Sequence, residues 1–395
     1  MKITKIDLMV LQTGKKHPFD NGCRPVVCRI HTDEGIFGDG EAAMLLMSGA
    51  LASFGMLKDL SEMILGMDPL DHEVVWNKLY RRTYFAQNGG PVMYSAVSAI
   101  DMALWDIKGK YFGVPVHRLL GGKFRDEVTC YASQFQSGWG DYMESAHTPE
   151  EYARNAREAV KEGYQVLKAD YLLTDEKGRD LDSGQQRGVL SPQLLNLAEE
   201  RVAAVREAVG KDVQLIVEGH GYTDVQSAMQ LAQRIKAYDI LFFEEPCTPF
   251  LPTAKYLADK MGISVSGGER LFTRWQYEPY MRERAYQLLQ PDLGNCGGIT
   301  EVKKILDMAE IYEIGVQLHC CASPLSVAAA LNVEASMQNF IFHEHTSFQQ
   351  RDFIRCLCEE DYQPKGAVMR VPDRPGIGNA LSEYALKTCE KYTVG

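Results

Sequence analysis

Between about residues 127 and 345, a short apolar run is followed again and again by a longer run whose apolar residues recur with helical spacing. The short runs are strand-like and number eight: VTCYAS, GYQVLKAD, VQLIVEGH, DILFFEE, ISVSGGE, AYQLLQPD, GVQLH and NFIFHE. Residues 171–190 show no clear period and predict a long loop after the second run. Alternating strands and helices predict a parallel sheet with right-handed crossovers, and eight such units close a (β/α)8-type, or modified TIM, barrel.

The rest of the chain predicts a smaller second unit. The first 50 residues alternate apolar and polar positions, which predicts a small antiparallel sheet, and residues 55–113 then change to helical spacing. A chain of 395 residues has room for a barrel and such a unit. We therefore expect an α/β protein with three parts: an N-terminal α+β capping domain at residues 1–125, the barrel at residues 126–345, and a C-terminal segment at residues 346–395 that packs back on the capping domain.

Several of the strand-like runs end in an ionisable residue where a plain core strand would not. These residues are Asp170, Glu218, Glu244, Glu269, Asp292, His319 and Glu344. The carboxyl ends of barrel strands meet on one face, which is where barrel enzymes carry out their chemistry. The sequence therefore predicts one polar site at that face.

Three of these carboxylates predict a metal site. Glu218 and Glu244 are 26 positions apart and Glu244 and Glu269 are 25 apart, so consecutive strands supply them. A single carboxylate at a strand end is more often a helix cap or part of a surface ion pair. Three at close range repel one another unless a cation lies among them, and oxygen ligands suit a hard ion such as Mg²⁺. Glu245 alternates to the opposite face from Glu244 and is expected to take no part.

Two histidines are candidates for proton transfer. His319 alone would more often be a core residue, but Asp292 ends the preceding strand, where a carboxylate can orient an imidazole and raise its basicity. His220 follows Glu218 by two positions and would share its face if the strand continued that far. His343 and His345 flank Glu344 and would face away from it.

Composition and charge weigh against several classes of partner. The formal net charge of -11 disfavours non-specific nucleic-acid binding. The ten cysteines include no C-x-x-C pair and resemble reduced core thiols rather than a disulfide framework. No apolar stretch reaches the roughly 18 residues that cross a bilayer, and the start MKITKIDLMV does not resemble a signal peptide. We expect a soluble, cytoplasmic protein without a membrane partner.

The motifs along the chain resemble those of the enolase superfamily, in the branch of mandelate racemase and the acid-sugar dehydratases. The matching stretches are SAIDMALWDIKGK, LLGG, FFEEP, SGGER, QPDLGNCGGIT and LHCCASP, and they occur in the family's order. The resemblance implies that Glu218, Glu244 and Glu269 bind one Mg²⁺ per subunit. It also implies that His319 and Asp292 form a catalytic dyad. By the same resemblance, Glu344 hydrogen-bonds the substrate carboxylate or its enolate, and the protein is a homo-oligomer.

Two strands depart from the racemase pattern. The second ends in KAD, with Lys168 and Asp170, where the racemase has a second lysine. The third offers Glu218 followed by His220, which is similar to the aldonate dehydratases of the galactonate and mannonate types. Lys168 is therefore a candidate for binding the substrate carboxylate, and Asp170 for binding a distal hydroxyl or orienting a neighbour.

Together these features predict a magnesium-dependent sugar-acid dehydratase. His319 would remove the proton next to the carboxylate, and His220 would protonate the departing 3-hydroxyl. The first alternative is a racemase or epimerase at C2, which would use the same enolate chemistry. A glycoside hydrolase and a non-catalytic sugar-acid-binding protein are weaker alternatives, since neither needs both the third carboxylate and the His-Asp pair. The resemblance also implies that loops near residues 15–24 and 44–56 contact the distal end of the substrate.

Overall fold

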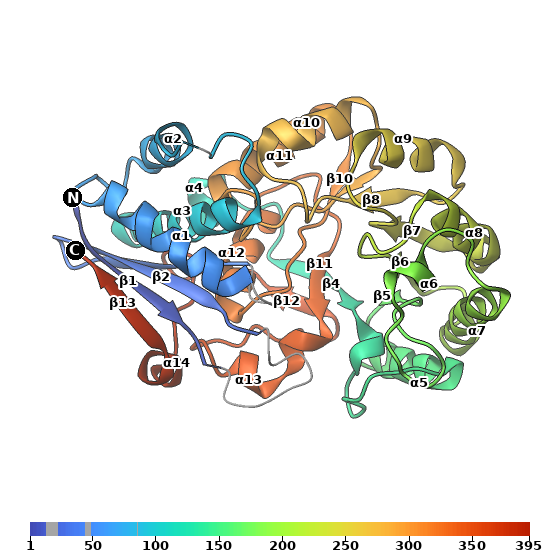
Figure 1. Ribbon diagram of the computed structural model, residues 1–395. Helices are drawn as coiled ribbons and strands as arrows, with labels where there is room; N and C mark the ends of the chain where they lie inside the picture. The colour runs from blue at the N-terminus through green and yellow to red at the C-terminus, as the bar shows by residue number, and fades with distance from the viewer. Residues whose placement is uncertain (13–22, 44–48, 85) are drawn as a thin grey trace.

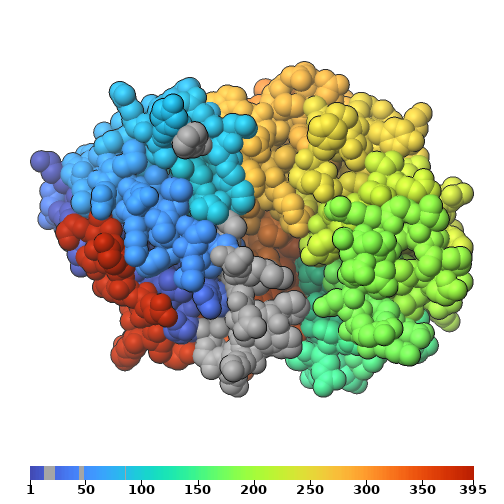
Figure 2. Space-filling view, viewed as in Figure 1, coloured from blue at the N-terminus to red at the C-terminus, as the bar shows by residue number. Residues whose placement is uncertain are grey.

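The computed structural model describes residues 1–12, 23–43, 49–84 and 86–395. The molecule has two parts that lie side by side (Figure 1). One part contains residues near the two ends of the chain, coloured blue and red in Figure 2. The other contains the barrel residues from the middle of the chain, coloured green and yellow. Much of the two loops predicted to contact the distal substrate, at residues 15–22 and 44–48, lies outside the described residues.

The smaller part is a four-stranded antiparallel sheet packed against helices. Its strand order is β13-β1-β2-β3. The strands are β1 (Ile3–Val10), β2 (Val26–Thr32), β3 (Phe37–Ala42) and β13 (Glu390–Val394), and the helices are α1 (Gly49–Ile64), α2 (His72–Arg82) and α3 (Pro91–Phe112). Helix α3 packs directly on β3, where a Cβ atom added at Gly40 would collide with the backbone of Ala99. Glycine at this position therefore lets the helix and the strand touch.

The larger part is a barrel of eight parallel strands, as the sequence predicts. The strands are β4 (Glu127–Ser133), β5 (Val166–Asp170), β6 (Gln214–Glu218), β7 (Ile240–Glu244), β8 (Val265–Gly267), β9 (Leu288–Leu289), β10 (Gly315–Val316) and β11 (His343–Thr346). They pair in chain order, and β11 returns to pair with β4. The ring closes between the last two strands, where Val316 N donates to Asn339 O at 2.9 Å and Ile341 N donates to Val316 O at 2.9 Å.

Helices connect the barrel strands on the outside (Figure 1). The longer ones are α5 (Pro149–Lys161), α7 (Pro192–Val209), α8 (Val225–Ile235), α9 (Leu251–Lys260), α10 (Thr273–Arg282), α11 (Gly298–Ile311) and α12 (Pro324–Ala335). Short helices are α4 (Val116–Leu119), α6 (Ser183–Gln186), α13 (Asp352–Arg355) and α14 (Glu383–Thr388). No helix within the described ranges is both long and apolar enough to span a bilayer.

The inside of the barrel has an apolar layer beneath a charged one. Tyr131, Val166, Ile216 and Phe242 pack together as a small cluster of buried residues. Side chains two positions apart on a strand share a face. Two positions further along the same four strands stand Ser133, Lys168, Glu218 and Glu244. The strand period therefore places a lysine and two glutamates inside the barrel, directly after its apolar plug.

The C-terminal segment contacts both parts of the molecule. Strand β12 (Val368–Arg370) pairs antiparallel with β4 of the barrel, and β13 pairs antiparallel with β1 of the smaller sheet. The buried carboxylate of Asp7 on β1 accepts a hydrogen bond from Thr393 at 2.8 Å and forms an ion pair with Lys391 at 2.9 Å. Segments at opposite ends of the chain thus share one sheet.

The predicted loop at residues 171–190 is held by one buried arginine, Arg201 of α7. Its guanidinium donates to the carbonyl oxygens of Tyr171, Thr174 and Asp175, and also to that of His147. The Arg201 side chain is 1% exposed. The loop follows Asp170 directly, so Arg201, together with Asp170 and Gln186, fixes how the chain leaves the end of β5.

Replacing Arg201 with lysine is expected to lower the free energy of unfolding by about 3 kcal/mol, because one ammonium cannot reach four carbonyls that a planar guanidinium serves together. Urea unfolding measures this loss, and limited proteolysis within residues 174–190 should become faster. Arg206→Lys is the matched control, since Arg206 also donates to four carbonyls but away from this loop. Equal proteolysis of the loop in both variants would contradict the assignment.

Candidate active site

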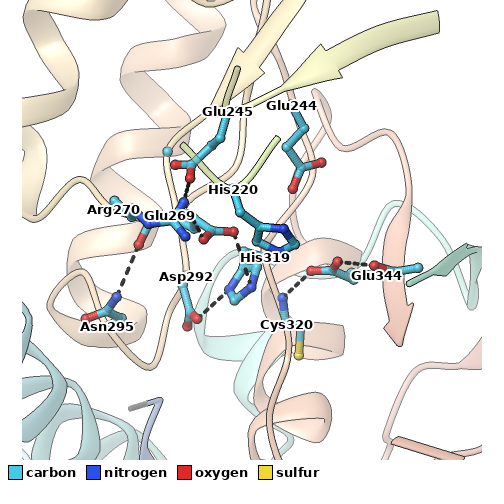
Figure 3. Close-up of polar contacts among 12 residues, drawn as sticks. His220, Glu244, Glu245, Glu269, Arg270, Asp292, Asn295, His319, Cys320 and Glu344 are labelled. Carbon is cyan, nitrogen blue, oxygen red and sulfur yellow. Dashed lines mark hydrogen bonds and ion pairs between the residues drawn. The ribbon is translucent and has the colours of Figure 1, made fainter. Parts of the chain in front are cut away.

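The nine residues predicted for the site lie at the carboxyl ends of the barrel strands and form two groups of contacts, six residues around Lys168 and three around His319. They are Lys168, Asp170, Glu218, His220, Glu244, Glu269, Asp292, His319 and Glu344. Figure 3 shows the two imidazoles among the surrounding carboxylates. Strand register explains part of this convergence, since Asp170 pairs with Glu218 and Glu218 pairs with Glu244 on adjacent parallel strands.

The ammonium group of Lys168 lies at the centre of the charged layer. Its Nζ is 3.1 Å from Glu218 Oε2, 2.5 Å from Glu244 Oε1 and 3.0 Å from Glu344 Oε1. Burial works against its charge, but Glu244 and Glu344 raise the pKa of Lys168 well above its ordinary value. Lys168 is thus a buried cation with three anionic partners. Its predicted contact with a substrate carboxylate would compete with those partners.

Glu218 and Glu244 have spare capacity to bind a cation. Glu244 Oε2 is buried and accepts no hydrogen bond, and Glu218 Oε2 is buried with the ammonium of Lys168 as its charged neighbour. Burial and the charge of Glu218 raise the pKa of Glu244 well above its ordinary value. This strain between two neighbouring carboxylates is what a divalent ion relieves, and their oxygens suit a hard ion. The donor set therefore fits Mg²⁺.

The third predicted ligand, Glu269, has other partners. Its Oε1 lies 2.9 Å from Arg270 Nη1, and its Oε2 lies 3.4 Å from His319 Nε2. Across residues 1–12, 23–43, 49–84 and 86–395, no three His, Cys, Asp or Glu side chains are grouped as metal ligands. Glu269 would complete a set with Glu218 and Glu244 only by directing an oxygen away from these partners.

His319 and Asp292 form a close pair. His319 Nδ1 lies 2.7 Å from Asp292 Oδ2, and Asp292 Oδ1 accepts from Gly294 N at 2.7 Å. Burial disfavours the charged imidazole, but Glu269, Glu344 and Asp292 raise the pKa of His319 to about 10. With Nδ1 directed at Asp292, the Nε2 atom of His319 is the one available to exchange a proton with a ligand.

His220 reaches the site by a backbone turn rather than by strand alternation. Strand β6 ends at Glu218, and His220 has a φ of +47°, a left-handed conformation that is uncommon outside glycine. Glu218 Oε1 accepts hydrogen bonds from the backbone N–H groups of Gly219 and His220, at 3.0 and 2.8 Å. The strand therefore does not continue to His220, and alternation does not set the direction of its side chain. The side chain still joins the site because the turn folds back onto Glu218.

The structure pairs His220 with Asp170, giving a second His-Asp pair. His220 Nδ1 lies 3.3 Å from Asp170 Oδ2, and Asp170 Oδ1 accepts from Leu172 N at 2.8 Å. Burial opposes the charged form, but Glu218 and Asp170 raise the pKa of His220 to about 9. Asp170 is expected either to bind a distal hydroxyl of the substrate or to orient a neighbouring side chain. Its contact with His220 fits the second of these roles.

Glu344 points into the barrel, whereas its two histidine neighbours point out. Glu344 accepts from Ser133 Oγ at 2.7 Å and from Cys320 N at 2.9 Å, in addition to its ion pair with Lys168. Outside the barrel, His343 contacts Glu334 and His345 contacts Tyr164. Burial raises the pKa of Glu344, but Lys168 and His319 outweigh it and lower that pKa below its ordinary value. Glu344 is thus an ionised acceptor that also fixes the backbone next to His319.

One pair of site residues was missed by reasoning from alternation. Glu245 has a φ of +40°, so it does not continue the strand, and its buried carboxylate contacts the guanidinium of Arg270. Arg270 also contacts Glu269, and Asn295 Nδ2 donates to Glu269 O at 3.1 Å (Figure 3). Strand alternation therefore does not describe Glu245, because the backbone turns after Glu244. The signal in the sequence was the arginine that directly follows Glu269.

Solvent exposure increases from the charged layer to the imidazoles. The side chains of Lys168, Glu218, Glu244 and Glu344 are at most 2% exposed, whereas those of His319 and His220 are 21% and 26% exposed. The carboxylates and the lysine thus form the floor of the site, and the two imidazoles lie at its accessible rim. A ligand that enters from solvent would meet the two imidazoles first.

Residues 9–121 match the mandelate racemase / muconate lactonizing enzyme N-terminal domain, and residues 151–385 match the enolase C-terminal domain-like family. D-galactonate dehydratase of Cronobacter sakazakii is 30% identical over 97% of this chain and 93% of its own length. D-galactonate dehydratase of Klebsiella pneumoniae is 31% identical over the same shares.

Solved structures agree with these matches. A member of the enolase superfamily from Salmonella Typhimurium is 42% identical, covers all of both chains and superposes with a TM-score of 0.95. The 3,6-anhydro-D-galactonate cycloisomerase of Zobellia galactanivorans shares the fold at 24% identity, with a TM-score of 0.82 over 99% of this chain and all of its own. The predicted fold and the predicted dehydratase class are confirmed. The chain is a dehydratase enzyme that belongs to the mandelate racemase / muconate lactonizing enzyme family of the enolase superfamily.

Proposed function

We propose that the enzyme removes water from an aldonate, a sugar acid with hydroxyl groups on C2 and C3, and yields the 2-keto-3-deoxy acid. The observation that carries the proposal is the pair of imidazoles at the rim, each held by its own aspartate, above a floor of buried carboxylates. One imidazole can accept a proton while the other donates one. The D-galactonate dehydratases among the relatives support an aldonate as the substrate class.

His319 is the proposed base. Asp292 holds the Nδ1 side of the ring, so Nε2 faces the site and takes the proton from C2. Glu269, which lies 3.4 Å from Nε2, stabilises the imidazolium that results. The electrons of the broken C–H bond pass into the substrate carboxylate, which becomes an enediolate.

His220 is the proposed acid. Asp170 holds its Nδ1 side, and its ring is the more exposed of the two imidazoles in the site. As the enediolate collapses, the C3–O bond breaks and His220 donates a proton to the oxygen, which leaves as water. The enol product gains a proton at C3 and loses the proton of its 2-hydroxyl, which gives the keto acid. His319 then releases its proton to solvent, and His220 takes up a new proton from solvent.

Glu218, Glu244 and Glu269 are the residues that would hold Mg²⁺. A bound divalent ion would polarise the substrate carboxylate and offset the anionic charge that raises the pKa of both histidines. Within the charged layer, Lys168 holds the carboxylates of Glu218, Glu244 and Glu344 together, and its charge helps to lower the pKa of Glu218 and of Glu344. Incubation of the protein with a panel of aldonates and aldarates, with assay for 2-keto acids, tests the proposed function. No product from any of them would refute it.

The histidine at the third strand has a distinct expected phenotype. His220→Gln should lose dehydration by about 100-fold or more, because the leaving hydroxyl is no longer protonated. It should retain exchange of the C2 proton with solvent deuterium, since His319 and Asp292 are intact. Proton NMR of the substrate in deuterium oxide measures the exchange. Tyr222→Phe is the control, because Tyr222 lies beside the His220 ring with a centroid distance of 5.8 Å.

Other patterns would change the assignment. Loss of exchange together with dehydration in His220→Gln would make His220 the base. Inversion at C2 of a substrate that lacks a 3-hydroxyl would favour the epimerase alternative. The homo-oligomer also stays a prediction, which sedimentation of the protein at micromolar concentration can check.

A further inference from the structure

The last residues of β3, in the capping part, touch both loops that carry the proposed dyad. Strand β3 ends at Ala42, and the described chain continues to Ala43. The loop after β9 contains Asp292, and the loop after β10 contains His319. Neither loop has helix or strand structure around these residues, so their backbone needs support from elsewhere.

The carboxylate of Glu41 supports the His319 loop. It is fully buried and accepts from Ser323 Oγ at 2.6 Å, Ser326 Oγ at 2.7 Å, Ser323 N at 3.1 Å and Ser326 N at 3.3 Å. These four donors lie at the start of helix α12, where a negative charge is favourable. Ser323 follows His319 by four residues, so Glu41 holds the far end of that loop.

The backbone next to Glu41 supports the Asp292 loop. Ala43 N donates to Gly294 O at 2.9 Å, and Gly294 N donates to Asp292 Oδ1 at 2.7 Å. The approach is close, because a Cβ added at Gly294 would lie 2.9 Å from Ala43 Cβ. Ala43, two residues after Glu41, therefore supports Gly294, and Gly294 in turn holds the carboxylate of Asp292 that orients His319.

We infer that Glu41 is a positioning residue of the reaction, which sets the geometry of the His319-Asp292 pair from the capping part. The inference rests on the proposed function for its catalytic readout. A merely structural contact between the two parts would affect stability alone. A positioning contact also sets where Nε2 of His319 stands relative to the substrate, and a displacement of about 1 Å is enough to cost roughly 100-fold in rate.

The test compares Glu41→Gln with Asp7→Asn. Asp7 is also a buried carboxylate of the capping part with several polar partners, but it contacts β2 and β13 and not the barrel loops. Glu41→Gln is expected to lower kcat by about 10- to 100-fold with KM changed by less than about threefold, and to slow C2 proton exchange by the same factor. Asp7→Asn is expected to lower the Tm with kcat unchanged.

A second readout needs no substrate. Backbone hydrogen exchange should become faster in Glu41→Gln at residues 292–297 and 319–326, and stay as in the wild type there in Asp7→Asn. Ser326→Ala, which removes one of four donors, should lie between wild type and Glu41→Gln in both measurements. The inference is overturned if Glu41→Gln and Asp7→Asn have the same kcat at a similar Tm. It is also overturned if backbone hydrogen exchange at residues 292–297 and 319–326 of Glu41→Gln is as slow as in the wild type. If the wild type dehydrates no sugar acid, the proposed function fails, and the exchange data alone still decide whether Glu41 holds the loops.

Discussion

His319→Asn is expected to abolish both dehydration and exchange of the C2 proton, each by about 1,000-fold or more. Asparagine can still accept or donate a hydrogen bond near Asp292, but it cannot take up a proton. No other imidazole among the residues that the structure describes lies against Asp292, so the function cannot pass to a neighbour. Proton NMR in deuterium oxide and an assay for the 2-keto acid measure the two losses on the same substrate.

His345→Asn is the matched control for this variant. His345 is buried on β11, outside the barrel, where Nδ1 contacts Tyr164 OH at 2.7 Å. Its loss should lower stability but leave turnover near the wild-type value. If His319→Asn retained more than about a tenth of the exchange rate, the base would have to be sought at Lys168, Asp170 or His220.

Glu244→Gln is expected to remove the response of the protein to Mg²⁺. The glutamine amide has one oxygen and no charge. The substitution therefore removes one of the two carboxylates whose mutual repulsion a bound Mg²⁺ would relieve. Titration calorimetry should show Mg²⁺ affinity at least about 100-fold weaker than in the wild type, and the rise of Tm with added Mg²⁺ should disappear. Turnover should fall to background. The wild type treated with a chelator should likewise lose turnover while remaining folded.

The control for the metal prediction is Glu301→Gln. Glu301 is fully buried and forms a two-pronged ion pair with Arg274 on the outside of the barrel. This variant should lose stability without any change in its response to Mg²⁺. Full turnover of the chelated wild type, or wild-type Mg²⁺ affinity in Glu244→Gln, would show that the floor of the site does not hold a catalytic ion.

Periodicity allowed the fold to be predicted because it reports which side of a strand or helix is buried. All eight barrel strands occur where the short apolar runs predict them, and Lys168, Glu218 and Glu244 face inward two positions after apolar core residues. The same reasoning failed where the strands stop. His220 and Glu245 both adopt positive φ values within two residues of a strand end, and alternation carries no information there.

The sequence also could not reveal how charges share partners inside the barrel. It placed Lys168 on the inner face, but which oxygens its long side chain meets depends on three other strands. The contact between Asp170 and His220 spans 50 positions of sequence. Such pairings follow from register and from the direction of each side chain, which a single sequence does not encode locally.

The pairing of β13 with β1 has a consequence for how the molecule is made. During synthesis the N-terminal strands emerge first, but the outer edge of β1 has no neighbour until residues 390–394 leave the ribosome. Until then, the backbone groups of that edge are open to pairing with another chain. The whole barrel is synthesised in this interval, so the capping sheet is begun first and completed last. Nascent chains stalled shortly before residue 390 should therefore aggregate more readily than the completed chain.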